Sequence, residues 1–504
     1  MTTLAVPVVL TALAPIAVPV LGALAYSVLG RRRPTAWIGP ACATAVLACA
    51  IVLAVEVAGS DPRMVLDGLL RVDALSAFML IVIGAVALLA TAATPAYLRA
   101  EIDAGRATAH TATRHNALVQ LFLAAMALAV LAANLGVVWV AIEATTIVTA
   151  FLVGQRRTRA AVEAAWKYVV ICSAGIALAL LGTIVLNFAA SRAPGGAVGL
   201  DLAALAAEAS TLDPCVTRIA IVLLIVGFGT KAGLAPLHAW LPDAHSQAPA
   251  PVSALMSGVL LSVAFYAILR VKVIADAALG TGFTRTLLAV MALASLLLAA
   301  SLLLAQRDYK RMLAYSSIEH LGLVALGTAI GGPLAMAAVL LHILGHGLVK
   351  SVLFLGAGRI LQVTGTSRID DVRGLAARHP VLAGCVGAGV LALIGLPPFS
   401  LFASELGIAS AGFAGSTGWV TAVALVLVLV IAAAMVGHTS RMLLGEPPDG
   451  PGAATASLRL SQRLPWATSV TLVGGLAASA VLGITAGPLS SLLHLAAETL
   501  VGAP

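Results

Sequence analysis

Three titratable side chains lie in a row within one apolar segment of the sequence. His342, His346 and Lys350 occur in L-H-I-L-G-H-G-L-V-K, at spacings i, i+4 and i+8. On an α-helix these positions drift only about 80° around the axis, with about 6 Å of rise per step. All three therefore share one helix face. Such a row of groups that gain and lose protons predicts a relay for proton transfer.

Two further ionisable residues lie in separate apolar segments. Glu143 lies in W-V-A-I-E-A-T-T-I-V-T, and Lys231 lies in G-F-G-T-K-A-G-L-A-P. A charged side chain at the centre of a bilayer costs about 2.5–3.5 kcal/mol on insertion scales, so each needs a partner, and we expect the two to form an ion pair. Lysine suits proton exchange better than arginine, because arginine stays charged when it is desolvated.

Other ionisable residues extend the candidate proton path. Glu319 and His320, in A-Y-S-S-I-E-H-L-G, would continue the histidine row, and Glu405, after P-P-F-S-L-F-A-S, would end it. His238 precedes W-L-P-D-A-H, where its simplest role is a hydrogen bond to backbone that Pro236 frees from the helix. For the whole set, the alternative to proton transfer is structural pairing between helices.

Four other polar positions are better explained by structure than by chemistry. Glu163 and Lys167 are spaced i, i+4 beside a basic cluster and predict an interfacial ion pair. Glu56 predicts a solvated helix end, and Asp243 predicts a helix cap or a contact that holds its loop.

The elements that position these residues follow from the low charge content. Only 50 of 504 residues are charged (29 Lys plus Arg, 21 Asp plus Glu), or 10%, against about 25% in soluble domains. Since about 20 apolar residues span a bilayer, the charge-free runs each hold a transmembrane helix; these runs are 1–30, 74–98, 286–306, 379–404, 406–440 and 464–497. A β-barrel would show alternating polarity, which these runs lack. The sequence predicts an all-α polytopic membrane protein, whose first run is a membrane helix rather than a cleaved signal peptide.

Breaks in the apolar runs give about fourteen helices. Their predicted centres are near 16, 47, 84, 123, 145, 177, 228, 260, 295, 320, 345, 391, 428 and 478. The fourth and fifth helices are separated only by Asn134-Leu135-Gly136. Pro236 and the pair Pro397-Pro398 are expected to break the helices that contain them.

The placement of basic residues predicts the orientation. Odd-numbered loops, counted from the N-terminus, carry 19 Lys and Arg, and even-numbered loops carry seven. The positive-inside rule then places the odd loops in the cytoplasm and both termini on the far side of a bacterial-type cell (inner) membrane. The net charge of +8 reflects this placement rather than nucleic-acid binding. The odd-loop residues are Arg31, Arg32, Arg33, Arg99, Arg106, Arg114, Arg156, Arg157, Arg159, Arg307, Lys310, Arg311, Arg359, Arg368, Arg373, Arg378, Arg441, Arg459 and Arg463.

The five cysteines do not suggest a metal or redox centre. They form no C-x-x-C pair, and no histidine lies at a spacing suited to zinc or an iron–sulfur cluster. We therefore expect no cofactor and no catalytic centre in this chain.

One long motif identifies a family resemblance. The segment G-T-K-A-G-L-A-P-L-H-A-W-L-P-D-A-H-S-Q-A-P-A-P-V-S-A-L-M-S-G, residues 229–258, resembles the proton-conducting antiporter-like subunits of respiratory complex I, Mrp-type antiporters and group-4 hydrogenases. The resemblance extends over about 70–440, and residues 164–182 and 310–322 look most like the hydrogenase-4 component F group. It implies two inverted five-helix repeats, each with one broken helix.

The resemblance also implies roles for individual residues. It would make Glu143 and Lys231 the charge pair of an input half-channel, the row from His342 to Lys350 part of a central polar axis, and Glu405 the terminal group. The helix after W-L-P-D-A-H usually carries a central lysine in this family, but Ser262 stands there. A serine can bridge water but cannot hold the positive charge.

These observations lead to three functional hypotheses. The first is a proton-translocating membrane subunit of a hydrogenase-like or complex I-like redox assembly, with other membrane subunits and a peripheral redox arm as partners. The second is a cation/proton antiporter subunit that moves sodium. The third, which Ser262 supports, is a non-conducting scaffold for a catalytic arm. The predicted divisions are N-terminal helices over 1–112, repeats over 113–272 and 273–412, and C-terminal helices over 413–504.

Overall fold

The computed structural model describes residues 6–30, 33–58, 62–193, 199–446 and 464–501. Four of the arginines used for orientation, Arg31, Arg32, Arg459 and Arg463, lie outside the described residues. Thirteen helices in the described part are long and apolar enough to cross a membrane. The helices that make these crossings are α1 (Val6–Leu29), α2 (Ile38–Val57), α3 (Ala74–Asp103), α4 (Ala109–Leu131), α5 (Leu135–Val153), α6 (Arg159–Ser191), α8 (Pro214–Ala232), α11 (Leu261–Leu279), α12 (Thr281–Leu304), α13 (Tyr309–Ile330), α14 (Gly332–Thr364), α18 (Gly418–Leu444) and α20 (Trp466–Ile484).

Shorter elements connect or extend these crossings. Helix α11 continues α10 (Ala250–Leu255) through the π-helical turn η4 (Met256–Leu260). The remaining elements are η1 (Arg33–Trp37), β1 (Arg63–Val65), β2 (Leu70–Val72), η2 (Gly154–Arg156), α7 (Leu202–Ala207), η3 (Ala209–Thr211), α9 (Trp240–Gln247), η5 (Ile369–Asp371), α15 (Leu375–Arg378), α16 (Pro380–Leu393), α17 (Ser400–Ala414) and α21 (Gly487–Val501). Strands β1 and β2 form an antiparallel hairpin before α3.

Both predicted helix breaks are confirmed. Helix α8 ends at Ala232 and α9 begins at Trp240, on either side of Pro236. Helix α16 ends at Leu393 and α17 begins at Ser400, on either side of Pro397-Pro398. Counting α16 and α17 as one broken crossing gives a fourteenth crossing beside the thirteen given above, in agreement with the expected number.

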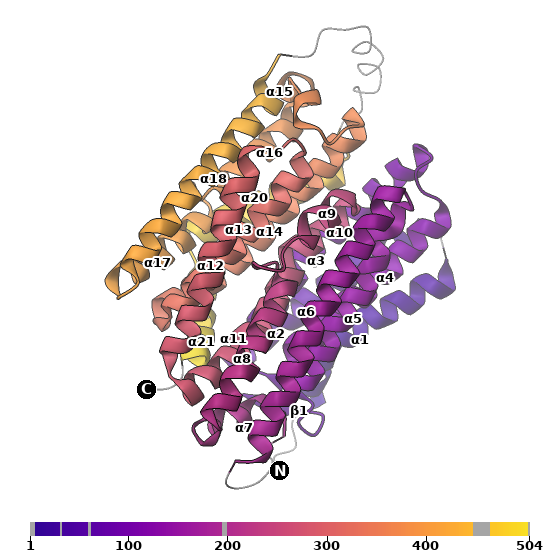
Figure 1. Ribbon diagram of the computed structural model, residues 1–504. Helices are drawn as coiled ribbons and strands as arrows, with labels where there is room; N and C mark the ends of the chain where they lie inside the picture. Colours follow the sequence, from indigo (N-terminus) through magenta and orange to yellow (C-terminus); the bar gives the residue numbers. More distant parts are fainter. Residues whose placement is uncertain (1–5, 31–32, 59–61, 194–198, 447–463, 502–504) are drawn as a thin grey trace.

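The crossings form two units of five with the same pattern. The first unit consists of α4, α5, α6, α8/α9 and α10/α11, and the second consists of α12, α13, α14, α16/α17 and α18. In each unit the fourth member is broken. A chain that makes five crossings ends on the side opposite to the one where it began. The second unit therefore starts at the opposite end of the bundle from the first. Figure 1 shows α7 and β1 at one end of this bundle and α15 at the other. The predicted second repeat, 273–412, ends before α18, and we propose that α18 completes it.

Small residues bring α6 and α8 into close contact. A Cβ placed on Gly227 of α8 would lie 2.5 Å from the Ala179 nitrogen and 2.6 Å from the Gly175 oxygen on α6. Such contacts between small residues are the usual way in which membrane helices approach, because lipid tails compete with large apolar side chains. This close packing sets the distance from α6 to the end of α8, where Lys231 lies.

Several basic residues that the sequence assigned to loops are buried in helices instead. Lys310, Arg270 and Lys272 are 1%, 8% and 7% exposed. Each has a local partner that offsets the cost of burial: Arg270 pairs with Asp73 at 2.7 Å, Lys272 pairs with Asp276 at 2.5 Å, and Lys310 donates to backbone carbonyls. The loop assignment of these three residues was wrong.

Candidate functional site

Lys231 is enclosed by hydroxyl groups from two neighbouring helices. Its ammonium group donates to Thr146 Oγ1 of α5 at 2.8 Å and to the Tyr168 hydroxyl of α6 at 2.5 Å. It also lies 4.7 Å from the centroid of the Tyr168 ring. The lysine is completely buried. Hydroxyl oxygens and a ring face thus stabilise the charge of a fully buried ammonium group.

The predicted direct ion pair between Glu143 and Lys231 does not form. Glu143 lies close enough to Lys231 for their charges to interact. Among the described residues, however, neither side chain makes an ion pair, and the buried Glu143 Oε2 has no hydrogen-bond partner. Thr146 lies one helical turn after Glu143 and takes the position next to the ammonium group. The hydrogen bond from Lys231 to the Thr146 hydroxyl thus stands in place of the expected contact.

The break between α8 and α9 is closed by two hydrogen bonds that involve the side chains of Trp240 and Ser295. Gly233, at φ +80°, ends α8 in the left-handed region, the conformation that suits glycine. The Trp240 indole donates to the Thr230 carbonyl at 2.9 Å, and the Ala235 amide donates to Ser295 Oγ of α12 at 2.9 Å. His238, at the mouth of this break, makes only a contact with the Pro236 carbonyl at 3.2 Å. The structure therefore supports the simple backbone role for His238 and does not bring it to the buried groups.

Helix α9 is tied to α13. Lys310 donates to the Ser246 and Ala248 carbonyls at 2.8 and 2.9 Å, which are unpaired groups at the C-terminal end of α9, where a cation is favoured. Asp243 forms ion pairs with Lys167 of α6 at 3.1 Å and Arg311 of α13 at 3.3 Å. This agrees with the expectation that Asp243 makes a contact that holds its segment. The predicted pair between Glu163 and Lys167 is also present, at 2.8 Å.

Lys350 of α14 is also fully buried. It donates to the Leu313 carbonyl at 2.7 Å and to Ser316 Oγ at 2.5 Å, both on α13. Like the partners of Lys231, the partners of Lys350 are neutral oxygens rather than carboxylates. Glu319, also buried, lies within Coulombic range of Lys350 and Glu405.

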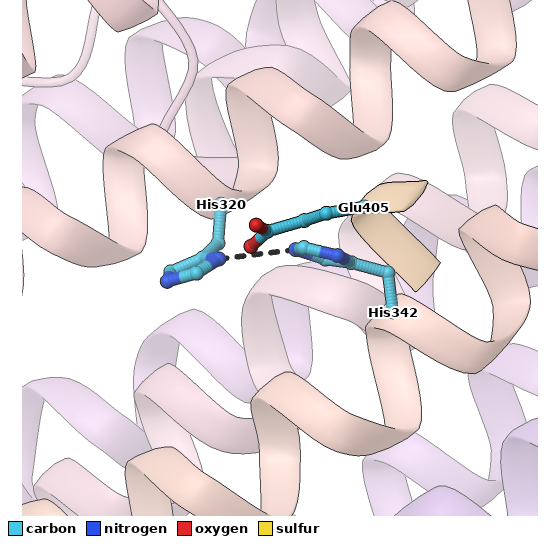
Figure 2. Close-up of side chains that lie close together, drawn as sticks. All are labelled: His320, His342 and Glu405. Carbon is cyan, nitrogen blue, oxygen red and sulfur yellow. Dashed lines mark hydrogen bonds between the residues drawn. The ribbon is translucent and has the colours of Figure 1, made fainter. Parts of the chain in front are cut away.

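The histidines form a cluster across two helices rather than a row on one. His320 Nδ1 of α13 lies 3.0 Å from His342 Nε2 of α14, and the ring centroids of His320 and His346 are 5.1 Å apart. Steps of about 6 Å along one helix exceed hydrogen-bond distance, so a side chain from the neighbouring helix fills the gap. Figure 2 shows His320 and His342 joined by this hydrogen bond, with Glu405 beside them. The expectation that His320 extends the row is corrected, because His320 lies within it.

The hydrogen bonds of this cluster all run in one direction from donor to acceptor. Ser404 Oγ donates to the Leu401 carbonyl at 2.9 Å, so it accepts from His342 Nδ1 at 3.0 Å. With its proton on Nδ1, neutral His342 accepts at Nε2 from the Nδ1–H of His320. His320 Nε2 then carries a lone pair, and it is buried with no hydrogen-bond partner in the described structure. His320 Nε2 is therefore a buried hydrogen-bond acceptor, and His346 Nε2 is a second buried ring nitrogen without a partner in the described structure.

Glu405 lies against the break between α16 and α17. Gly395, at φ +68°, follows α16, and a Cβ on it would collide with the Glu405 carboxylate. One carboxylate oxygen of Glu405 and one nitrogen each of His320 and His342 all lie within 4.8 Å of one another. Such a set could approach a single metal ion, a possibility that the sequence did not suggest.

Three buried serines, Ser257, Ser262 and Ser317, lie in the elements that follow α9 and precede α14. Ser257 and Ser317 join α13 to the η4 turn at 2.8 Å. Ser262, where the family usually carries lysine, is buried, and its hydroxyl has no hydrogen-bond partner among the described residues. A buried hydroxyl of this kind is normally satisfied by water.

Sequence reasoning missed the hydroxyl-bearing partners of the charged residues. Tyr168, Thr146, Ser316 and Ser404 contact Lys231, Lys350 or His342 directly. For Thr146 a signal existed, because it is spaced i+3 from Glu143 and so shares its helix face.

The geometry defines a class of protein: a polytopic helical membrane protein with ionisable side chains buried along its interior. Comparison with known proteins makes this more specific. The family described as NADH:quinone oxidoreductase/Mrp antiporter, transmembrane, matches residues 132–432. A hydrogenase-4 component F homolog from Methylacidiphilum infernorum is 41% identical over 70% of this chain and 74% of its own. The chain belongs to this antiporter-like family.

Solved structures share its fold. A chain of the Mrp complex from Dietzia sp. superposes with a TM-score of 0.84 at 23% identity, covering 99% of this chain and 98% of its own. A chain of respiratory complex I from Thermus thermophilus gives 0.78 at 24% identity, covering 98% and 100%. These identities establish the fold alone, and both neighbours belong to complexes of several membrane subunits.

Proposed function

We propose that the chain is a proton-translocating membrane subunit of a hydrogenase-like or complex I-like redox complex. The observation that carries this proposal is the environment of Lys231 and Lys350: both are fully buried, and neither pairs with a carboxylate among the described residues. An ammonium group held only by neutral oxygens can lose its proton without leaving a second charge behind. Ionisable residues inside membrane proteins mark ion paths by default.

The proton path would run in two stages. In the first, a proton passes between Glu143 and Lys231, with Thr146 and Tyr168 orienting the ammonium group. In the second, Lys350 exchanges with the cluster of His346, His320 and His342, which delivers to Glu405. Water next to Ser262 would bridge the two stages, because a hydroxyl can hydrogen-bond to a bridging water molecule.

Partner subunits would supply the driving reaction. The chain would sit in a bacterial-type cell membrane with its odd loops in the cytoplasm, beside other membrane subunits and a peripheral redox arm. Electron transfer in that arm would change the charge near Lys231 and thereby its tendency to hold a proton.

Proton uptake by the reconstituted complex tests this proposal. With Lys231→Ala we expect proton uptake to fall about 100-fold or more, the size of effect typical of a lost proton-transfer group. Lys167→Ala is the matched control, since Lys167 is half exposed and should leave uptake unchanged. Intact assembly with unchanged uptake in Lys231→Ala would refute the proton path and favour a scaffold. Sodium-dependent transport without a redox partner would favour the antiporter alternative.

A further inference from the structure

A large cavity lies at the basic end of the bundle, away from the buried lysines. Its volume is about 1560 Å³, and it opens between the α1–α2 connection, the C-terminal half of α3, the start of α4, the end of α14 and the start of α20. These segments border odd-numbered loops, so the cavity lies at the end that carries most of the arginines. None of the proposed proton-path residues lines it.

Arg359 is the unusual residue of this cavity. It lines the cavity, is only 6% exposed, and makes one weak contact, from Nη1 to Gln362 Oε1 at 3.4 Å. No carboxylate among the described residues pairs with it. A buried guanidinium without a counter-ion is costly, and a negatively charged occupant of the cavity would offset that cost.

The other charges on the wall leave the balance positive. Arg99 and Arg106 line the cavity with Arg359, against one acidic residue, Asp103. Arg106 is engaged by Glu101 at 2.9 Å. Arg99 is exposed and makes no ion pair within the described ranges. Arg99 and Arg359 therefore remain to bind an anion.

Aromatic rings place the opening at the surface of the membrane. Trp37 and Trp466 stack with ring centroids 6.5 Å apart and are 50% and 70% exposed. Tryptophan collects at the level of the lipid headgroups. The cavity thus combines a basic interior with an apolar, aromatic rim at that level.

We propose that this cavity binds an anionic glycerophospholipid. Its phosphodiester pairs with Arg359 and Arg99, and its acyl chains leave past Trp37 and Trp466 into the bilayer. Guanidinium groups suit phosphate because their planar donors bind two oxygens together, and basic pockets between transmembrane helices on the cytoplasmic side are typical sites for acidic headgroups. The lipid would fix the start of α20 against α3 and α14.

Native mass spectrometry of the full chain, with whatever subunits co-purify, tests the proposal. The protein is exchanged into detergent containing equimolar phosphatidylglycerol and phosphatidylcholine. We expect phosphatidylglycerol to be retained at least several-fold over phosphatidylcholine, and Arg359→Gln to abolish this preference. Arg307→Gln is the matched control, because Arg307 is exposed and lies outside the cavity.

Two further arms separate the alternatives. Trp466→Ala removes rim surface without touching the charge, and it should weaken retention of both lipids while keeping the preference. Equal retention of the two lipids by the unaltered chain, or an unchanged preference in Arg359→Gln, would overturn the proposal. Displacement by excess inorganic phosphate would show that the site takes a free anion, and a co-purifying subunit that blocks lipid uptake would show a protein occupant; either result also overturns it. If Arg359→Gln does not fold, Arg99→Gln serves in its place.

Discussion

The charged members of the site could be predicted from the sequence, and their partners could not. Lys231 and Lys350 stand out because a lysine in an apolar run is costly. Tyr168 and Ser404 do not stand out, because hydroxyl-bearing residues are common in membrane helices and carry little penalty. The expected contact between Glu143 and Lys231 was wrong for this reason: spacing within one segment says nothing about which hydroxyl from a neighbouring helix reaches a charge first.

The Tyr168 hydroxyl orients the Lys231 ammonium group, so its removal should slow proton transfer. In Tyr168→Phe the ring that packs against Trp240 at 5.0 Å remains, and the fold should be kept. We expect proton uptake by the reconstituted complex to fall about tenfold, a loss of about 1.4 kcal/mol, as for a lost hydrogen bond to a charged group. Tyr309→Phe removes a buried hydroxyl that bonds the Thr366 carbonyl and should leave uptake unchanged. Equal effects of the two substitutions would contradict a special role for Tyr168.

Ser404 should act through the orientation of His342. In Ser404→Ala, His342 Nδ1 loses its acceptor, so the proton is free to move to Nε2 and reverse the His320 hydrogen bond. We expect slower uptake with an altered pH profile, and recovery in Ser404→Thr, which restores a hydroxyl. A loss of uptake that Thr does not restore, with an unshifted pH profile, would indicate packing rather than proton placement.

At the scale of elements, the sequence predicted long helices and both breaks but not the short segments. Proline and glycine mark a break through backbone chemistry alone, which is why the ends of α8 and α16 follow from Pro236 and Pro397. Helix α9 and helix α21 were not anticipated as separate elements. Their short lengths give little periodicity, and α9 is held by tertiary contacts from Lys310 and Arg311.

The start of α3 depends on a buried acid. Asp73 caps α3 through the Ser76 amide at 2.9 Å and pairs with Arg270 at 2.7 Å and Arg71 at 3.0 Å. Burial opposes ionisation of Asp73, but the two guanidinium groups outweigh it and hold the pKa of Asp73 well below its usual range. Asp73→Asn keeps a good cap and removes the charge, so it should destabilise the protein by about 3 kcal/mol.

The destabilisation should depend on pH with a definite sign. Because the folded pKa of Asp73 is depressed, its contribution is complete above the unfolded value of about 3.9 and is lost as pH falls below it. Denaturation in detergent should therefore show a constant difference between the original and Asp73→Asn proteins above about pH 5 that shrinks at lower pH. Asp201→Asn, at the cap of α7 without an ion pair in the described structure, should show little difference at any pH. A gap that widens in acid would contradict this account.

For the whole molecule, the apolar content predicted the class of fold, and the alternation of basic loops predicted its orientation. The number of crossings and the paired breaks agree with the predicted class of fold, and the orientation stays a prediction. What the sequence could not provide was the contact between the two five-helix units, since it depends on groups far apart in the chain, such as the Ser295 hydroxyl and the Ala235 amide.

The orientation can be tested with a native cysteine. Cys215, at the start of α8, is exposed, whereas Cys42, Cys172 and Cys385 are buried. It borders an even-numbered loop, so a membrane-impermeant maleimide should label it from outside intact cells. Arg157→Cys, introduced into a Cys215→Ser background, should be labelled only after the cells are opened. The reverse pattern would invert the predicted topology.

The attachment of α9 has a mechanical consequence. This short helix follows Lys231 in the chain, yet Arg311 binds its first turn and Lys310 binds its last turn. Both residues begin the helix that also supplies the oxygens around Lys350. A small displacement of α13 would therefore pull on the segment behind one lysine while shifting the ligands of the other. Through these contacts the proton affinities of the two lysines would change together, without a continuous chain of hydrogen bonds between them.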